Sequence, residues 1–186
     1  WESLVERCVA EGWSGVEALS GIPGSVGATP IQNVGAYGQE VSNVVTSVEV
    51  LDRSAARVHA MTPHDCRFGY RSSVFKVEPG RYVVLSVQLR LQAKGHGAPV
   101  RYAELARRLG VAVGETAPLA DVRSAVLELR RAKGMVLDDA DHDTWSAGSF
   151  FTNPVLAASE VPAEAPSWPQ PGGRVKTSAA WLIEQA

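Results

Sequence analysis

Five glycines crowd one short stretch of the chain, between Gly21 and Gly38. Closely spaced glycines allow backbone N–H groups to approach an anion such as a pyrophosphate. Side-chain donors for the same ligand are available at Ser25, Thr29, Gln32 and Asn33. The spacing matches neither of the two common phosphate loops, GxGxxG and GxxxxGKS/T. The stretch therefore predicts either a cofactor-binding loop or an ordinary region of tight turns.

Arg71 is a candidate for binding a carboxylate. It lies in the segment YRSSVF, residues 70–75, where two apolar neighbours indicate partial burial and two serines could orient the guanidinium. A planar and permanently charged fork can hold a carboxylate with two hydrogen bonds or stabilise a developing enolate. The alternative for Arg71 is a structural salt bridge.

Ser149 lies in the segment WSAGSFFTNP, residues 145–154, between a glycine and two aromatic side chains. A serine in this setting can bind a substrate, act as a nucleophile or donate a proton. It does not form the nucleophile elbow GxSxG, because Phe151 occupies the position of the second glycine. The alternative is an ordinary serine in a turn.

Thiol chemistry and metal binding are both weakly indicated. Cys8 and Cys66 lie far apart and form no CxxC pair, which predicts two packed, reduced thiols in a cytoplasmic protein. The four histidines never occur at the i, i+4 spacing of a helical metal pair. The acidic segment 138–143 could hold a hard cation, but it lacks the glycine and the distal glutamate of an EF-hand loop. It is predicted to be a solvated acidic loop, and no metal site is predicted.

The elements that must position these residues begin with a helix and an antiparallel sheet. Apolar residues at helical spacing predict a helix over residues 4–9. Alternating apolar and polar residues predict strands over 44–50 and 85–91, with a short strand at 57–61 pairing across the turn at 52–56. The pair Thr62-Pro63 then has the form of a helix start.

Residues 92–99 combine glycine, proline and polar side chains, which is typical of a linker. We place a domain boundary here, with one domain over residues 1–92 and the other over 93–186. Beyond the linker, residues 102–109 predict a helix closed by Gly110.

Further elements of the second domain follow the same reasoning. Apolar spacing predicts a helix over 122–129 that ends near Gly134, and a last helix that Thr177 could cap. Residues 157–173 are rich in alanine, proline, glycine and glutamate and are predicted to form a surface loop.

Composition restricts the class of protein. With 186 residues and 45 % hydrophobic side chains, the chain predicts a folded protein of one domain or two small ones. A formal net charge of −2 argues against a nucleic-acid partner. Apolar stretches are too short for a membrane span, and no signal segment opens the sequence. Neither end carries the usual helix start or stop signals, so we expect both to be cuts in a longer protein.

Three motifs together resemble a known family. They are IPGSVG with PIQNVGAYG (residues 22–38), CRFGYRSS (66–73) and GSFFTNP (148–154). In this order they resemble the UDP-N-acetylenolpyruvoylglucosamine reductases, the flavoenzymes of the MurB family in bacterial peptidoglycan precursor synthesis. The resemblance implies an α+β fold: the second half of a vanillyl-alcohol-oxidase-type FAD-binding domain, followed by an α+β substrate-binding domain that is truncated here.

The resemblance also implies a set of residues that lie against FAD, mainly its pyrophosphate and its ring. They are Ile22, Pro23, Gly24, Ser25, Gly27, Ala28, Thr29, Gln32, Asn33, Gly35, Ala36, Tyr37 and Gly38. Tyr70 would border both the flavin and the carboxylate of the substrate.

Roles in catalysis and in substrate binding follow from the same resemblance. Arg71 matches the arginine that stabilises the enolate, and Ser149 matches the serine that protonates the substrate carbon. The UDP-sugar would be held by Tyr102, Arg130, Lys133 and Asn153. The implied substrate is UDP-N-acetylglucosamine enolpyruvate, which FAD reduces to UDP-N-acetylmuramate while NADPH re-reduces the flavin. The implied full-length protein is a cytoplasmic monomer active in cell-wall biogenesis.

Two departures from the family pattern keep alternatives open. The first flavin subdomain should precede Trp1, and the third catalytic residue, a glutamate, should follow Ala186. The isolated chain is therefore expected to be inactive and to purify without flavin. Another flavin oxidoreductase of the same fold, or a non-catalytic UDP-sugar-binding fragment, remains a competing hypothesis.

Overall fold

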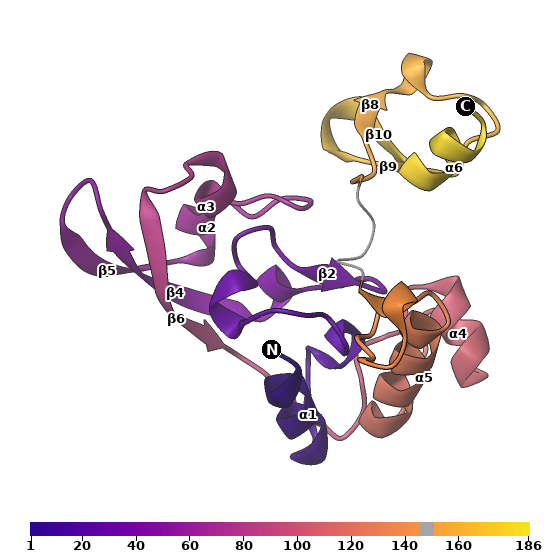
Figure 1. Ribbon diagram of the computed structural model, residues 1–186, viewed down its shortest axis with the longest axis horizontal. Helices are drawn as coiled ribbons and strands as arrows, with labels where there is room; N and C mark the ends of the chain where they lie inside the picture. Colours follow the sequence, from indigo (N-terminus) through magenta and orange to yellow (C-terminus); the bar gives the residue numbers. More distant parts are fainter. Residues whose placement is uncertain (146–150) are drawn as a thin grey trace. The chain divides into compact units, whose positions relative to one another are not determined.

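The computed structural model describes residues 1–145 and 151–186 (Figure 1). The chain divides into two compact units, Trp1–Ser146 and Ala147–Ala186. Each unit has its own small sheets and helices, in agreement with the predicted α+β class. None of the described helices is long and apolar enough to cross a membrane.

An antiparallel sheet forms one side of the first unit (Figure 1). Its middle strand is β4 (Val45–Asp52), flanked by β5 (Arg57–Met61) and β6 (Tyr82–Leu89). This arrangement confirms the predicted hairpin across residues 52–56. Val48 and Val50 of β4 are fully buried, as the alternating pattern requires.

The sheet departs from strict alternation at a bulge in β6. Glu49 pairs with Ser86, but the next residue, Val50, pairs with Val84, so Leu85 has no partner across the ladder. Its side chain is 50 % exposed, although the sequence pattern predicts it on the buried face. An extra residue in one strand shifts the side chains of that strand by one position, and the sequence pattern does not show this shift.

Two short helices, α2 (Pro63–Cys66) and α3 (Val74–Val77), lie between β5 and β6. The hydroxyl oxygen of Thr62 accepts a hydrogen bond from the N–H of Asp65, which confirms the predicted helix start. The hydroxyl oxygen of Ser73 caps α3 in the same way, through the N–H of Phe75. The two caps fix the course of the segment that carries Arg71.

Short elements of the N-terminal part share a hydrophobic core with this sheet. The helix α1 (Glu2–Ala10) confirms the predicted first helix, and β1 (Trp13–Ser14) pairs with β7 (Gln92–Ala93). Short 3₁₀ helices follow, and β2 and β3 form a two-stranded ribbon. Their bounds are η1 (Glu17–Leu19), η2 (Val26–Ala28), β2 (Gly35–Ala36), β3 (Gln39–Glu40) and η3 (Val41–Asn43).

Helices α4 (Ala103–Leu109) and α5 (Leu119–Arg131) pack against each other and complete the first unit, with η4 (His142–Thr144) after them. Gly110 ends α4 in the left-handed conformation, as predicted. The two helices form a second hydrophobic core, in which Ala18 of η1 takes part. Residues 103–131 therefore pack within the same compact unit as the sheet. The division into residues 1–92, which would bind the flavin, and residues 93–186, which would bind the substrate, remains a proposal.

The second unit holds a three-stranded antiparallel sheet in the order β8-β10-β9. Its strands are β8 (Val155–Ala157), β9 (Ser167–Pro169) and β10 (Arg174–Thr177), with η5 (Ala158–Glu160) and η6 (Pro171–Gly173) between them. The prediction of a surface loop over 157–173 is therefore wrong for β9. This strand is too short to show a period and contains a proline, which is tolerated because β9 lies at the edge.

The last helix, α6 (Ala179–Glu184), confirms the predicted final helix but not its cap. Ser178, and not Thr177, accepts the hydrogen bond from the N–H of Trp181. Thr177 is the last residue of β10, where it is fully buried and its hydroxyl donates to the carbonyl of Pro166. Because Thr177 belongs to β10, the next hydroxyl, that of Ser178, caps the helix.

Candidate functional site

The guanidinium of Arg71 lies directly against the glycine-rich stretch. Its Nη2 donates a hydrogen bond to the carbonyl oxygen of Gly35 at 2.5 Å. A Cβ atom at position 35 would approach Nη1 of Arg71 to 2.9 Å, so a side chain there would displace the guanidinium. Glycine at position 35 is therefore required by a close approach.

Partly buried hydrogen bonds hold the two motifs together. The hydroxyl of Ser73 donates to the carbonyl of Ile31 at 2.5 Å, and Nδ2 of Asn33 donates to the carbonyl of Gly69 at 3.1 Å. Asn33 is 1 % exposed and also donates to the carboxylate of Glu40 at 2.8 Å. These bonds join residues 31–33 to residues 69–73, which the sequence separates by almost forty positions.

Among the described residues, no carboxylate oxygen lies within 4 Å of the guanidinium of Arg71. The alternative interpretation of Arg71, a structural salt bridge, therefore finds no acidic partner there. The guanidinium carbon instead lies 5.4 Å from the ring centre of Tyr70. Arg71 also adopts a positive φ of 50°, a conformation that costs energy for a residue with a side chain. Within the described part of the chain, the guanidinium contacts a carbonyl and a ring, so it keeps N–H groups for an external carboxylate.

The stretch from Gly24 to Ala28 can approach an anion through its backbone. The first hydrogen bond of η2 runs from the N–H of Ala28 to the carbonyl of Ser25, so the N–H groups of Val26 and Gly27 have no partner within the helix. A Cβ atom at Gly24 would meet nothing within 4 Å, which leaves this backbone open. The stretch therefore fits the pyrophosphate of FAD, because it supplies two N–H groups that have no partner within the helix.

Side-chain donors predicted for the same ligand behave differently. The hydroxyl of Thr29 is buried and donates to the carbonyl of Val26 at 2.8 Å. The amide of Asn33 is occupied as described above, whereas Gln32 and Ser25 are exposed. Thr29 and Asn33 therefore shape the loop from inside, and any contact they make with a cofactor would be through the backbone.

Three of the four predicted substrate residues come together around Tyr37. The rings of Tyr37 and Tyr102 meet edge to face with their centres 5.8 Å apart. Burial raises the pKa of the Tyr37 hydroxyl, and the nearby charges of Lys133 and Arg130 partly oppose this rise. Tyr37 belongs to the glycine-rich stretch, so the predicted flavin and substrate residues adjoin each other at this point.

Arg130 is held at the base of this group. Its Nη2 donates to the carbonyls of Gly21 and Met135, each at 3.2 Å, while its Nε is buried without a partner among the described residues. Burial lowers the pKa of its guanidinium. Gly21 makes room for it, because a Cβ there would lie 3.2 Å from Nε. An arginine with a desolvated and incompletely bonded fork is suited to binding an anion.

Two predicted residues, Asn153 and Ser149, belong to the second part of the sequence. Asn153 belongs to the second unit, where its Oδ1 accepts a hydrogen bond from the N–H of Ala179 at 3.0 Å. It therefore supports the start of α6. Ser149 lies outside the described residues, and its predicted role as proton donor stays a prediction.

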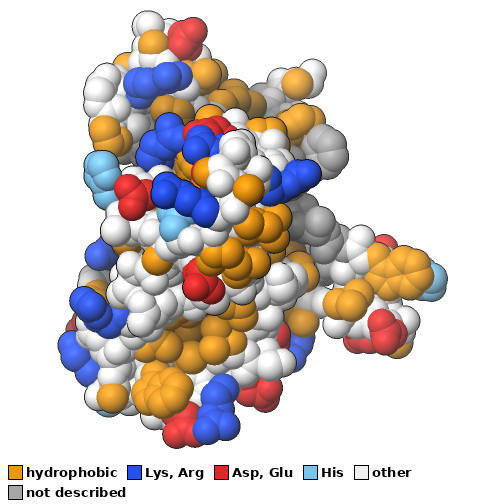
Figure 2. Space-filling view, turned by 90° about the vertical axis from the view of Figure 1, so that its left-hand side faces the viewer, with side chains coloured by type: hydrophobic (Ala, Val, Ile, Leu, Met, Phe, Trp, Pro, Cys, Tyr) orange, Lys and Arg blue, Asp and Glu red, His pale blue; other side chains and the backbone are white. Residues whose placement is uncertain are grey.

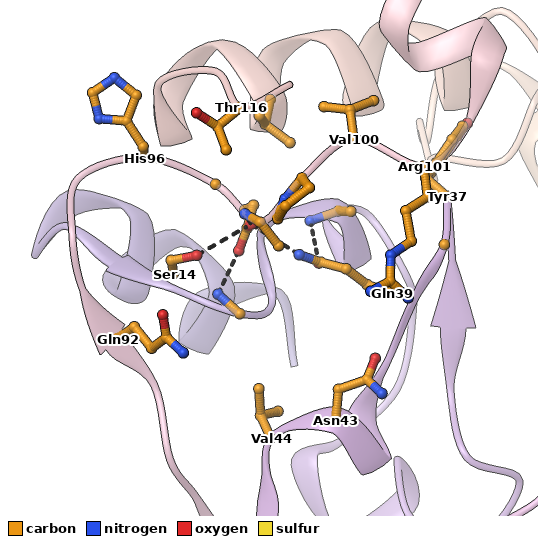
Figure 3. Close-up of a pocket in the computed structure, with 18 of the residues that line it drawn as sticks. Ser14, Tyr37, Gln39, Asn43, Val44, Gln92, His96, Val100, Arg101 and Thr116 are labelled. Carbon is orange, nitrogen blue, oxygen red and sulfur yellow. Dashed lines mark hydrogen bonds between the residues drawn. The ribbon is translucent and has the colours of Figure 1, made fainter. Parts of the chain in front are cut away.

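A cavity of about 780 Å³ lies next to the glycine-rich stretch (Figure 3). Of the predicted site residues, its lining includes Tyr37 and Gly38. Glu17 also lines this cavity. It is 1 % exposed and accepts hydrogen bonds from the N–H groups of Gly15 and Ala98 and from Nε2 of Gln39. These bonds join the N-terminal part of the chain to the segment after β7.

The sequence analysis did not single out Glu17 or Glu104. The two carboxylate oxygens of Glu104 lie 2.9 and 2.8 Å from Nζ of Lys133. Both had a local signal. Glu17 is a lone acid among Val16, Ala18 and Leu19, and Glu104 lies two residues after a predicted substrate ligand.

The two free cysteines and the surface charges complete the chemistry of the chain. Cys8 and Cys66 are buried and unpaired, as predicted.

On the face shown in Figure 2, lysine and arginine side chains alternate with acidic ones, and hydrophobic side chains are exposed between them. Among the described residues, no group of three or more histidine, cysteine, aspartate or glutamate side chains is placed to hold a metal ion.

Comparison with known proteins agrees with these motifs. Residues 1–61 match the FAD binding domain family. The whole chain aligns with UDP-N-acetylenolpyruvoylglucosamine reductases from Thermobifida fusca (59 % identical), Salinispora arenicola (58 %) and Streptomyces coelicolor (56 %). The alignments cover all of this chain but 56, 53 and 52 % of these relatives, respectively.

A solved structure shows the same relationship. The crystal structure of UDP-N-acetylenolpyruvylglucosamine reductase (MurB) from Thermus caldophilus superposes with a TM-score of 0.57 at 25 % identity. It matches 98 % of this chain and 49 % of that protein. The chain thus spans about half the length of the relatives it matches. At this sequence identity, the chain is homologous, over its full length, to about half of each of these UDP-N-acetylenolpyruvoylglucosamine reductases.

Proposed function

We propose that this chain is part of a cytoplasmic enzyme that reduces UDP-N-acetylglucosamine enolpyruvate to UDP-N-acetylmuramate for peptidoglycan synthesis, with FAD as cofactor and NADPH as reductant. The observation that carries the proposal is the contact between Arg71 and Gly35, which joins an arginine without a carboxylate partner among the described residues to the glycine-rich stretch. The names of the relatives support the choice of substrate.

When bound, FAD would supply hydride to the enolpyruvyl double bond. The chain's own contribution is positioning and electrostatics. The open backbone at Gly24–Gly27 would hold the pyrophosphate, and Gly35 and Ala36 in β2 would lie against the ring system, with Tyr70 beside them.

Arg71 would meet the negative charge that builds up on the substrate as hydride arrives. This charge spreads from the carbon onto the carboxylate. A guanidinium stabilises such a charge best when it is already held in the right position before the reaction. The bond to Gly35 supplies that placement. Ser149 would then give its proton to the neighbouring substrate carbon, which completes the reduction.

The UDP group would lie against Tyr102, Arg130 and Lys133, with Asn153 as a further ligand. Two cations beside an aromatic pair suit a diphosphate next to a ring-bearing nucleoside. We assign residues 1–92 to the flavin part and residues 93–186 to the substrate part on this basis.

The test is a substitution of Arg71 by lysine in a full-length protein that contains this chain. Lysine keeps the charge but loses the fork, so NADPH should still reduce the flavin at the normal rate while reoxidation by the enolpyruvyl substrate slows by about 10²-fold. Stopped-flow absorbance under anaerobic conditions separates the two half-reactions. An unchanged second half-reaction would contradict the role of Arg71, and failure of the substrate to reoxidise wild-type flavin would favour another flavin oxidoreductase of the same fold.

One observation favours a second function for the isolated chain. Because the chain spans about half of its relatives, it could bind the UDP-sugar without catalysing its reduction. Calorimetric titration with UDP should then show binding that Lys133→Ala weakens. A flat titration for both proteins would exclude this second function.

A further inference from the structure

Two ion pairs connect α4 with α5 and the residues that follow it. Lys133 Nζ contacts both carboxylate oxygens of Glu104, at 2.9 and 2.8 Å. One helical turn away on α4, Arg108 pairs with Glu128 of α5. The two pairs have similar exposure, because the side chains of Lys133 and Glu104 are 43 % and 33 % exposed and those of Arg108 and Glu128 are 54 % and 45 % exposed.

The positions of the two pairs relative to the proposed UDP site differ. Glu104 lies two residues after Tyr102, and its charge acts on the hydroxyl of Tyr37 together with the charges of Lys133 and Arg130. Among the described residues, Arg108 and Glu128 form an ion pair with each other and with none of the residues proposed to bind UDP. Glu104 is therefore a negative charge inside the group of residues proposed to bind a diphosphate.

Glu104 leaves Lys133 able to bind a second anion. An ammonium group has three N–H donors, and the two contacts with Glu104 occupy two of them. The third can bind a phosphate oxygen without moving the lysine. The carboxylate would then lie close to the diphosphate, and the two negative groups would repel each other across the shared ammonium.

We propose that Glu104 is a positioning residue that holds Lys133 in place and at the same time weakens its hold on the diphosphate. This inference rests on the proposed function, in which Lys133 binds the UDP group. Glu104 would limit the affinity for every ligand that carries this diphosphate.

The proposed reaction gives a reason for such a weakening. Reduction changes the enolpyruvyl ether and leaves the diphosphate as it was, so contacts with the diphosphate stabilise substrate and product equally. Binding of this uniform kind does not accelerate the chemical step, and a very tight hold on the diphosphate would slow the release of product. A carboxylate that competes for Lys133 keeps the product able to leave.

The experiment compares UDP with uridine in calorimetric titrations of the chain and of Glu104→Gln, which removes the charge and keeps the shape. We expect the variant to bind UDP roughly threefold to tenfold more tightly, the scale of one partly exposed charge acting on a nearby polyanion. Uridine carries no phosphate and should bind both proteins alike. Raising the salt concentration should reduce the difference for UDP.

Two further variants keep the test specific. Glu128→Gln breaks the neighbouring ion pair between the same helices and should leave the affinity for UDP unchanged. Glu104→Asp keeps the charge and should stay within about twofold of the original affinity. Circular dichroism of each variant checks that the fold is retained.

Failure of the inference and failure of the proposed function give different results. If the chain binds UDP and Lys133→Ala weakens this binding, but Glu104→Gln leaves it unchanged or weakens it, Glu104 does not compete and the inference is overturned alone. If neither the chain nor Glu104→Gln binds UDP, the proposed function and the inference are both overturned for this site.

Discussion

At the scale of single residues, the site depends on a close approach between a glycine and an arginine. A Cβ atom at Gly35 would lie 2.9 Å from Nη1 of Arg71, from the carbonyl oxygen of Gln39 and from Cγ of Glu40. We expect Gly35→Ala to destabilise the protein by about 1–3 kcal/mol, because two of these neighbours belong to the paired ribbon and the third to the arginine that the ribbon holds. Thermal unfolding followed by circular dichroism measures the change.

Gly69→Ala is the matched control for this substitution. A Cβ at Gly69 would meet only Cβ of Ser72, at an ordinary 3.9 Å, and Gly69 has no positive φ. The control should change the unfolding temperature by much less than Gly35→Ala. Equal losses in the two variants would show that the close approach at Gly35 carries no special cost.

The two thiols should be inert in the folded protein. Burial raises the pKa of the Cys66 thiol to about 11, and it raises the pKa of the Cys8 thiol as well. Since the thiolate is the reactive form, about one molecule in a thousand carries it at Cys66 at pH 8. We expect both cysteines to react with a disulfide reagent such as DTNB only after unfolding in guanidinium chloride. Fast reaction of either thiol under native conditions would contradict their placement in the core.

At the scale of elements, one carboxylate closes the β4–β5 hairpin and ties it to β6. Asp52 at the end of β4 accepts hydrogen bonds from the N–H groups of Ser54 and Ala55 in the turn. It also pairs with Arg81, the residue before β6, at 3.0 Å. The hydrogen bond from Arg81, together with those from the turn, holds the pKa of Asp52 below its ordinary value of 3.8.

This shift predicts how stability depends on pH. A carboxyl group whose pKa is lower in the folded state stabilises the protein at pH values above the unfolded pKa, and this contribution is lost as the pH falls through about 4 and below. We expect Asp52→Asn to be less stable at pH 7 and to lose less stability than the original protein between pH 5 and pH 2. Urea unfolding across this range measures the difference. Parallel pH curves for the two proteins would show that Asp52 does not contribute.

At the scale of the whole molecule, Glu17 joins the two hydrophobic cores of the first unit. It lies in η1, whose Leu19 belongs to the core under the sheet and whose Ala18 belongs to the core of α4 and α5. Its carboxylate binds the N–H groups of Gly15 and Ala98, which come from segments more than eighty residues apart. Gly97 fits beside it, because a Cβ there would lie 3.0 Å from Oε1.

Removal of this carboxylate should therefore loosen the unit as a whole. We expect Glu17→Ala to cost about 2–4 kcal/mol, because several buried donors lose their acceptor at once. Hydrogen exchange should show faster exchange at the N–H groups of Gly15 and Ala98 in the variant. Exchange that stays slow at Ala98 would mean that the chain after β7 is held by other contacts.

Much of this fold could be predicted from local patterns. The first helix, the hairpin of β4 and β5, the cap of α2 and the glycine end of α4 each depend on residues that are close in the sequence, at most from Val48 to Met61 in the hairpin. The edge strand β9, the exposed Leu85 and the cap at Ser178 could not be predicted in this way. Each depends on how far a neighbouring strand extends and in which register it pairs, and these are properties of two segments together.

The sequence by itself determined the chemistry available to this protein: the glycine-rich stretch, Arg71, Ser149 and the cations after α4, in the order that a reductase family uses. Only the tertiary structure decided which of them meet. Arg71 donates a hydrogen bond to Gly35, and the ring of Tyr102 contacts that of Tyr37. These contacts form because partly buried hydrogen bonds and two hydrophobic cores bring distant segments together. Glu17 and Glu104 belong to no recognisable motif, because each has a partner far away in the sequence: Ala98 lies 81 positions from Glu17, and Lys133 lies 29 positions from Glu104.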